Sequence, residues 1–220
     1  MPTLVQKAIA ASNSVAFASN NTAGNFLVCT ICSGGDITNV TDTAGNTWTK
    51  AVDQGQAALL LFTDIWYAEN CAAGANTVTL SGGFANFEHI AVAEYSGMAT
   101  STVLDQIASQ NGNNTISEPD SNGTPTTTQA DELLIGAIGN NSTRTVDPWG
   151  SSFTEQADQA SNSRALSWGD RIVTVTDAYD ASGTLSGITD WQCLIATFKV
   201  AAAAGGSAFK PTFLLMGVGT

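Results

Sequence analysis

Basic side chains are scarce in this chain of 220 residues. Seven Lys and Arg stand against 19 Asp and Glu, which gives a formal net charge of −12. Binding to nucleic acids or to anionic membranes needs a cluster of basic side chains, and the few present here are spread along the chain. The composition therefore argues against both kinds of partner.

Charged residues of either sign are also few. They make up 12% of the sequence, about half the usual share in a soluble domain. The polar surface must therefore come from Thr, Ser, Asn, Gln and Gly. This composition is typical of β-rich proteins of cell surfaces, virions and filaments.

Long apolar runs and a secretory leader are missing as well. No run approaches the roughly 18 apolar residues of a membrane-spanning helix, so we expect no membrane insertion. The first residues, MPTLVQKAIAASNSV, lack the basic region and the continuous apolar region of a signal peptide. We expect a location on a virion or outside the cell, reached without such a signal, as for a phage protein released by lysis.

Catalytic motifs are absent from the sequence. The single histidine, His89, has no HExxH or GxSxG motif around it. Glu88 and Glu94 would share a strand face, as the paired carboxylates of jelly-roll glycosidases do, but Ile90 and Val92 lie between them. We therefore expect a protein that is not an enzyme and needs no cofactor.

Four cysteines are present, at positions 29, 32, 71 and 193. Cys29 and Cys32 form a CxxC pattern, but residues three apart in a strand point to opposite faces. No second CxxC accompanies them, so a zinc site is not expected. We interpret the cysteines as small buried hydrophobic residues, with a disulfide between two of them as the alternative.

Short β-runs separated by Gly, Asn, Asp and Ser fill the chain. FEHIAVAEYS alternates between two faces, whereas FLVCTI and ALLLF are apolar on both faces, as in strands covered on both sides. No clear internal repeat is visible, and residues 110–129 read as a long loop. The expected strands are TLVQKAI, NFLVCTICS, NTWTKAV, AALLLFTDIWYAE, NTVTLS, FEHIAVAEYS, DELLIGAIG, RALSWGDRIVTVT, GTLSG and DWQCLIATFKV.

Such spacing predicts an all-β fold, a two-sheet antiparallel β-sandwich of the jelly-roll type, over residues 1–200. Several segments resemble uncharacterised lectin-like or concanavalin-like jelly-roll proteins of bacteria and phages. The resemblance implies an extracellular or virion-associated jelly roll and brings no catalytic residues. It is carried by VTDTAGNTWT, IWYAENCAAGANTVTLSG, AVAEYSGMA with LDQ, TQADELLIGA, and GDRIV with DWQCLIATFKV.

Calcium is the metal that the sequence favours most. Glu118, Asp120 and Asn122 alternate before Gly123, so their oxygens could converge while the glycine makes the bend. A second group of oxygen ligands is Asp36, Asp42 and Asn46. The alternative for both groups is ordinary turn chemistry, because Asp and Asn side chains bond to their own backbone in turns.

A sugar-binding surface is the main alternative function. Among five tryptophans, Trp149 in VDPWGSS is predicted to lie exposed in a loop, where it could stack on a glycan. A carbohydrate-binding module, adhesin or receptor-binding domain would use Trp149 together with the 110–129 loop. Its partners would be surface glycans.

The last segment, AAAAGGSAFKPTFLLMGVGT, is an Ala/Gly hinge followed by an apolar stretch of strand length. Buried side chains of this kind each contribute about 1.5–3 kcal/mol, whereas an exposed stretch invites aggregation. The segment could fold onto its own sandwich or add to a sheet of a neighbouring copy. The proposed assembly residues are Phe209, Pro211, Phe213, Leu214, Leu215, Met216 and Val218.

The sequence thus predicts a non-enzymatic structural protein that assembles with copies of itself or with other virion proteins. Residues 201–220 would carry the assembly contact.

Overall fold

The computed structural model describes residues 1–83 and 87–202, and this part of the chain is almost entirely β-structure. Within these ranges no helix is long and apolar enough to cross a membrane. The strands are β1 (Thr3–Ala10), β2 (Ser14–Ala16), β3 (Phe26–Ser33), β4 (Ile37–Asp42), β5 (Thr49–Gln56), β6 (Leu61–Ala68), β7 (Thr77–Gly82), β8 (His89–Ser96), β9 (Leu104–Gly112), β10 (Asp131–Asn140), β11 (Val146–Trp149), β12 (Thr154–Ser161), β13 (Arg164–Thr174), β14 (Gly183–Leu185) and β15 (Trp191–Lys199).

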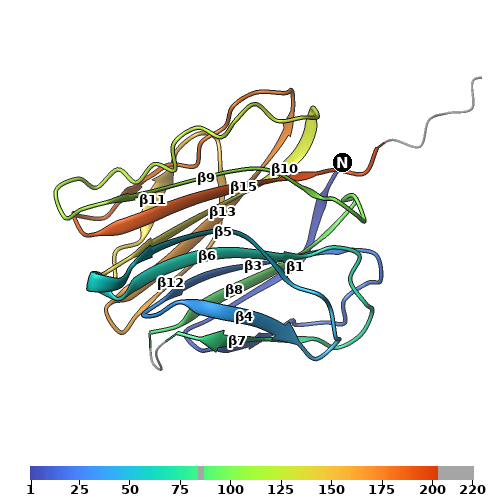
Figure 1. Ribbon diagram of the computed structural model, residues 1–220, viewed down its shortest axis with the longest axis horizontal. Helices are drawn as coiled ribbons and strands as arrows, with labels where there is room; N and C mark the ends of the chain where they lie inside the picture. The colour runs from blue at the N-terminus through green and yellow to red at the C-terminus, as the bar shows by residue number, and fades with distance from the viewer. Residues whose placement is uncertain (84–86, 203–220) are drawn as a thin grey trace, which may run out of the picture.

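Two five-stranded antiparallel sheets pack face to face (Figure 1). The first sheet has the order β1-β8-β3-β6-β5, and the second has the order β12-β13-β10-β15-β9. This arrangement confirms the all-β, two-sheet sandwich. The expected C-terminal extension falls on residues 203–220, which lie outside the described part of the chain.

Apolar side chains from both sheets fill the space between them. Phe26 and Tyr67 of the first sheet meet Phe198 of the second, with ring centroids 4.8 and 5.5 Å from that of Phe198. Trp168 and Leu133 are fully buried in the same core. Each such side chain contributes about 1.5–3 kcal/mol by leaving water, so this central core holds the sheets together.

A further layer covers the outer face of each sheet. The small sheet β2-β7-β4 closes a second core over the first sheet, around Leu27, Ile31 and Trp66. A third core over the second sheet includes Leu134 and Tyr179 and lies under β11 and β14. Covering on both sides explains why every residue of β3 is buried and confirms the expectation drawn from FLVCTI.

The two main sheets repeat one strand plan. The first sheet uses β1, β3, β5, β6 and β8, and the second uses β9, β10, β12, β13 and β15. Taken in chain order within each half, both sheets place their strands first-fifth-second-fourth-third. The inner strands β3 and β10 also direct side chains with the same spacing to the outer cores. These side chains are Leu27 and Ile31 of β3 and Leu134 and Ile138 of β10.

Bulges repeat as well. The register shifts on the edge strand β1 between Leu4 and Gln6, and on β9 beside Leu104. At the opposite edge of each sheet, the register shifts on β5 and on β12. In both strands the shift lies two to three residues after the first residue of the strand. The chain is therefore built from two structurally similar halves, which the sequence did not reveal.

The 110–129 stretch is only partly the free loop that the sequence predicts. Its first residues complete β9, and residues 117–127 then run along 177–185. Backbone amides and carbonyls join the two stretches at five points, including Leu185 N to Ser117 O (2.7 Å) and Thr127 N to Asp177 O (2.9 Å). The stretch thus takes the place in the second half that β2 has in the first.

Each of the ten expected strands overlaps an observed strand, and five observed strands were missed. The missed strands are β2, β4, β9, β11 and β12. Both β9 and β12 are polar edge strands whose residues are mostly half-buried, so they lack the apolar signal. The run ALLLF is not all strand, because Ala57–Leu59 forms a 3₁₀ turn that ends at Leu60 with φ of 51°.

The cysteines are small buried residues, as the first of the two interpretations predicts. All four are buried with free thiols, so the disulfide alternative is wrong for this structure. Cys32 faces the central core and Cys29 the outer core, as expected for residues on opposite faces of β3. Burial raises the pKa of Cys32 to about 12, so its thiol stays protonated.

The sheets approach each other closely near Gly139 in β10. A Cβ at this position would lie 2.1 Å from Thr63 Oγ1 and 3.1 Å from Cys32 Sγ of the opposite sheet. We predict that Gly139→Ala lowers the stability by about 1–3 kcal/mol through overpacking, and that adding Thr63→Ala restores part of it. Gly123→Ala is the control, since a Cβ there meets nothing within 4 Å. Equal melting temperatures for the Gly139 and Gly123 variants would contradict the prediction.

Candidate functional site

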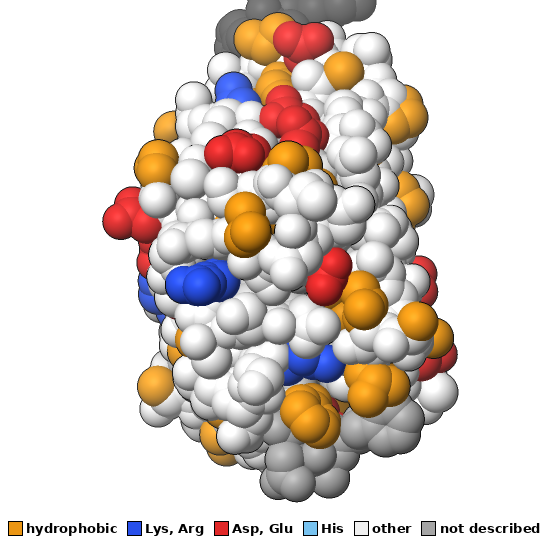
Figure 2. All heavy atoms as spheres, turned by 90° about the vertical axis from the view of Figure 1, so that its left-hand side faces the viewer, with side chains coloured by type: hydrophobic (Ala, Val, Ile, Leu, Met, Phe, Trp, Pro, Cys, Tyr) orange, Lys and Arg blue, Asp and Glu red, His pale blue; other side chains and the backbone are white. Residues whose placement is uncertain are grey.

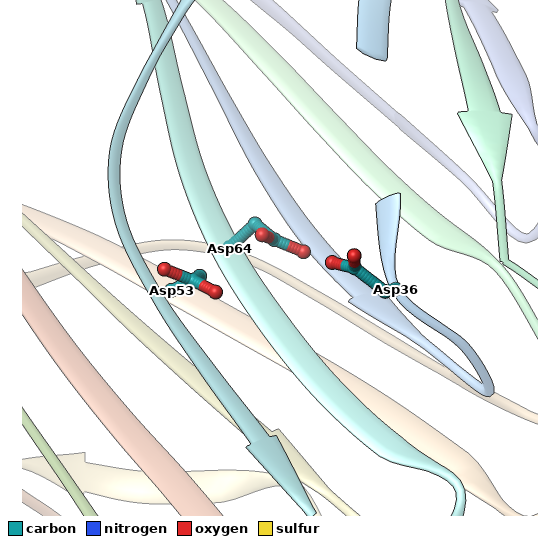
Figure 3. A group of neighbouring side chains, drawn as sticks. All are labelled: Asp36, Asp53 and Asp64. Carbon is teal, nitrogen blue, oxygen red and sulfur yellow. The ribbon is translucent and has the colours of Figure 1, made fainter. Parts of the chain in front are cut away.

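Three carboxylates gather on one face of the first sheet. Asp36, Asp53 and Asp64 have oxygens within 4.8 Å of one another, and Figure 3 shows the side chains turned toward a common point. Asp53 and Asp64 are opposite each other in the β5–β6 register. Among the described residues this is the group whose carboxylates could hold a metal ion.

A lysine already neutralises this group. Lys50 Nζ lies 2.9 Å from Asp64, 3.4 Å from Asp36 and 3.7 Å from Asp53, and it also lies over the ring of Trp66. Burial raises the pKa of Asp64 to about 6, although Lys50 acts in the opposite direction. The ammonium occupies the place that a cation would need.

We predict that Lys50→Met creates a calcium-responsive protein. The variant loses stability because Asp64 is left buried without its cation, and calcium then stabilises it by binding the three carboxylates. Thermal melting with calcium and with chelator measures this. The native protein is the control, and its melting temperature should not respond. A variant equally indifferent to calcium would contradict the prediction.

The other predicted calcium ligands behave as turn residues. Asp42 accepts bonds from Asn46 N (2.9 Å), Trp48 Nε1 (3.0 Å) and Asn76 Nδ2 (3.0 Å), which fold the turn around it. Its supposed partner Asp36 is instead part of the Lys50 group. The grouping of Asp36 with Asp42 and Asn46 was therefore wrong. No sequence signal marks Asp53 and Asp64, because they meet only through strand register.

Glu118, Asp120 and Asn122 do not converge on one point. Glu118 and Asp120 line the same surface hollow, whereas Asn122 is outside it. Asn122 donates its backbone N–H to Asp120 Oδ1 at 2.7 Å, an ordinary Asx turn. The structure thus brings together two of the three residues.

Trp149 is not in an exposed loop, which corrects the expectation. It lies at the end of β11, partly buried, and stacks on Phe153 with 5.8 Å between ring centroids. Its indole nitrogen is buried. Its neighbours Pro148 and Gly150 do reach the hollow that Glu118 and Asp120 line.

Buried His89 and half-buried Ser161 form a serine–histidine pair that the sequence did not reveal. His89 Nε2 of the first sheet lies 3.0 Å from Ser161 Oγ of the second. Burial lowers the pKa of His89, and among the described residues no side chain hydrogen-bonds its Nδ1. A hydrolytic triad needs an orienting carboxylate at that nitrogen. The contact is better explained as a polar bridge between the sheets.

Glu94 is committed to internal bonds. It accepts from Gln6 (2.6 Å), Asn21 (2.8 Å), Asn25 (2.6 Å) and the backbone of Thr22 (2.8 Å). These bonds lower its pKa although burial acts to raise it. A carboxylate held in this way joins three segments of the first half and is not free to act as an acid or base.

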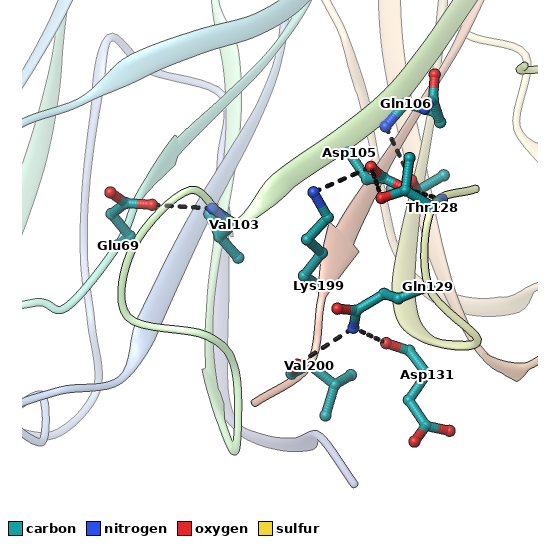
Figure 4. A network of polar contacts seen from close by, with 10 residues as sticks. Glu69, Val103, Asp105, Gln106, Thr128, Gln129, Asp131, Lys199 and Val200 are labelled. Atoms are coloured by element: carbon teal, nitrogen blue, oxygen red, sulfur yellow. Dashed lines mark hydrogen bonds and ion pairs between the residues drawn. The ribbon is translucent and has the colours of Figure 1, made fainter. Parts of the chain in front are cut away.

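A second carboxylate network occupies the corresponding place in the other half. Asp105 is paired with Lys199 at 3.1 Å and accepts from Thr128 (Figure 4). Burial acts to raise the pKa of Asp105, but hydrogen bonds from Thr128, Glu132 and Lys199 lower it to about 2. Burial and the nearby Asp105 raise the pKa of Glu132 to about 8. Glu132 is therefore mostly protonated at neutral pH.

This pair predicts a loss of stability in alkali. Glu132 has a folded-state pKa above its unfolded value, so its contribution is complete below about pH 4 and is lost as pH rises to about 8. We predict that Glu132→Gln, which stays uncharged at every pH, raises the melting temperature at pH 8–9 by several degrees and changes it little at pH 4. Melting curves from pH 4 to 9 measure this, with exposed Asp131→Asn as the control. A Gln variant whose melting temperature falls with pH as the native one does would contradict it.

Comparisons with known families, curated proteins and solved structures found no match. Resemblance to jelly-roll proteins of bacteria and phages therefore stays a prediction. Function must be argued from the geometry of the chain itself.

Proposed function

We propose that the chain is a non-enzymatic structural protein that assembles with copies of itself, on a virion or in an extracellular filament. The apolar stretch 209–218 is the assembly element and docks on a neighbouring subunit. The observation that carries this proposal is that the sandwich closes its cores without that stretch.

The three cores are already covered within the described residues. Phe26, Leu133 and Phe198 in the central core have no exposed surface, and the inner strands of both sheets are buried on both faces. A stretch such as FLLM would find no vacant core face here. Its burial, at about 1.5–3 kcal/mol per side chain, favours a contact with another chain.

One sheet edge suits such a contact. β6 ends one residue after its last pair with β5, but β13 continues four residues beyond its last pair with β12, Asp170 with Thr154. In this continuation Ile172 is 44% exposed, and Val175 just beyond it is 62% exposed. Among the described residues no backbone pairs with the outer edge of this stretch.

The described chain ends near this edge of β13. Val200 donates its N–H to Asp131 O, and Asp131 pairs with Thr174 at the end of β13. Figure 1 shows that the described chain ends at the end of the sandwich where its N-terminus also lies. Strand addition at β13 would supply both backbone bonds and apolar burial.

We predict that removing residues 203–220 abolishes assembly and leaves a folded monomer with an unchanged melting temperature. Light scattering and negative-stain microscopy compare the two chains. Monomers in both cases would overturn the proposal, and so would unfolding of the truncated chain, which would assign the stretch to its own core.

Two lysine substitutions test the acceptor edge. Ile172→Lys with Val175→Lys should block assembly of the full-length chain. Ile188→Lys is the matched control, because Ile188 is 55% exposed but lies by the start of β15, at the opposite end of the sandwich. Assembly by the edge variant would reject this edge without rejecting the apolar stretch.

A further inference from the structure

We propose that Lys50 and Asp64 condense to an isopeptide bond, which joins β5 to β6 within one chain. Lys50 Nζ lies 2.9 Å from Asp64 Oδ1, and the two residues belong to neighbouring antiparallel strands. The bond would be a covalent modification of the first sheet. It does not depend on the assembly proposed above, which uses the second sheet.

A bulge in β5 brings the reacting groups to one face of the sheet. Residues three apart in a regular strand point to opposite faces, but the register of β5 shifts between Lys50 and Val52. The extra residue lets both Lys50 and Asp53 lie on the face of Asp64. Figure 3 shows the side chains of Asp53, Asp64 and Asp36 turned toward one another there.

Asp64 is the carboxyl group suited to attack by an amine. Its side chain is 2% exposed, and among the described residues neither of its oxygens has a hydrogen bond of regular geometry. Lys50 Nζ is therefore close to the carboxyl group without being aligned as an ordinary donor. Burial raises the pKa of Asp64 to about 6, although Lys50 lowers it. The uncharged carboxyl, which is the form that an amine attacks, is thus populated near neutral pH.

The second lysine–aspartate pair lacks these properties. Asp105 lies 3.1 Å from Lys199, but it also accepts hydrogen bonds from the backbone and the side chain of Thr128. Burial acts to raise the pKa of Asp105, yet its hydrogen bonds lower the pKa to about 2. This carboxylate stays ionised and resists attack. The contrast assigns the reaction to Lys50 and Asp64.

Two neighbouring carboxylates can take the proton that Lys50 must lose. Burial acts to lower the pKa of Lys50, but Asp64, Asp53 and Asp36 raise it, so the reaction starts from an ammonium. Asp36 Oδ1 lies 3.4 Å and Asp53 Oδ2 3.7 Å from Nζ. Both side chains are more than half exposed, so either can accept the proton from Nζ and release it to solvent.

The step balances without a cofactor or a second substrate. The amine of Lys50 attacks Cγ of protonated Asp64, so that the Nζ–Cγ bond forms and a Cγ–O bond breaks. The hydroxyl group leaves with a second proton from Nζ as one water molecule. The proton that Asp36 or Asp53 releases to solvent replaces the one that Asp64 took up. One ammonium and one carboxylate thus become one amide and one water.

Burial and proximity favour the product. The amide replaces a buried carboxylate and a partly buried ammonium, and both ions are costly to desolvate. Contact between the two groups also makes the condensation intramolecular, which greatly raises the effective concentration of the amine. The ring centroid of Trp66 lies 5.3 Å from Nζ, so the ring covers the amine on one side.

Few other amines compete for such a link. The chain has four lysines, at positions 7, 50, 199 and 210. Figure 2 shows how sparse basic side chains are at the end of the molecule that it views, among mostly uncharged atoms. Lys7 bonds to the side-chain amide of Gln156, not to a carboxylate, which makes it a suitable control.

The first test is the intact mass of the denatured full-length protein. We expect a mass that is one water molecule below that of the sequence. Chymotryptic cleavage at Leu59, Leu60 or Phe62 should leave two peptides joined through Lys50 and Asp64. Lys50→Arg keeps the positive charge but has no amine, so it should show the full mass and a lower melting temperature. Lys7→Arg is the matched control and should keep the loss of water.

Three results would overturn the inference. The first is a native protein with the full mass of its sequence. The second is a loss of water that persists in the Lys50→Arg variant, because it would then come from another reaction, such as succinimide formation. The third is a pair of joined peptides that maps to Lys199 and Asp105 instead.

Discussion

Burial of the inner strands on both faces is the constraint on which the rest of this structure depends. A strand that is apolar on one face can rest on a single core, but β3, β10 and β15 are apolar on both. Each main sheet therefore needs a cover on its outer face as well as its partner sheet. The small sheet β2-β7-β4 and the paired stretches 117–127 and 177–185 meet that need.

The repeated strand plan follows from the same constraint. Each half is a five-stranded sheet with its own outer cover, and the two halves meet through the faces that remain apolar. The edges then lie beside each other, β1 by β12 and β5 by β9. Lys7 bonds to Gln156 across one seam, and Gln54 bonds to Asn111 across the other. Bulges on all four edge strands interrupt the ladders there and oppose sheet-to-sheet aggregation.

The sequence predicted the elements whose signal is local and missed those defined by distant pairing. DELLIGAIG and DWQCLIATFKV are apolar enough to predict buried strands. In β8, Ile90 and Val92 lie in one core and the alternating Ala91 and Ala93 lie in another. TEQADQAS has no such signal, because β12 is an edge strand built mostly from polar, half-buried residues. The sequence does not reveal the two halves, because they share strand order and the alternation of side-chain faces more than they share residue identity.

The candidate sites differ in the same way, between residues that are close in sequence and residues that only the fold brings together. Glu118 and Asp120 line the same hollows, as their alternation along one extended stretch predicts. Asp53, Asp64 and Lys50 meet across a strand pair, and His89 meets Ser161 across the two sheets, 72 residues away in the chain. No pattern within one segment records contacts of that kind. Trp149 was misplaced for a related reason, because its loop-like neighbours Pro148 and Gly150 conceal a short strand whose partner β14 is far away in sequence.

The small number of charged residues affects both the internal sites and the surface. Of the few charged groups, Lys50, Asp64, Glu94, Asp105, Glu132 and Arg164 are used inside the sandwich or at its seams. Arg164 is 4% exposed and donates to the carbonyls of Leu59 and Leu60, which anchors the β12–β13 turn to the first sheet. What remains outside is largely uncharged, so recognition must rely on hydroxyl and amide groups or on exposed backbone edges. The continuation of β13 is such an exposed backbone edge.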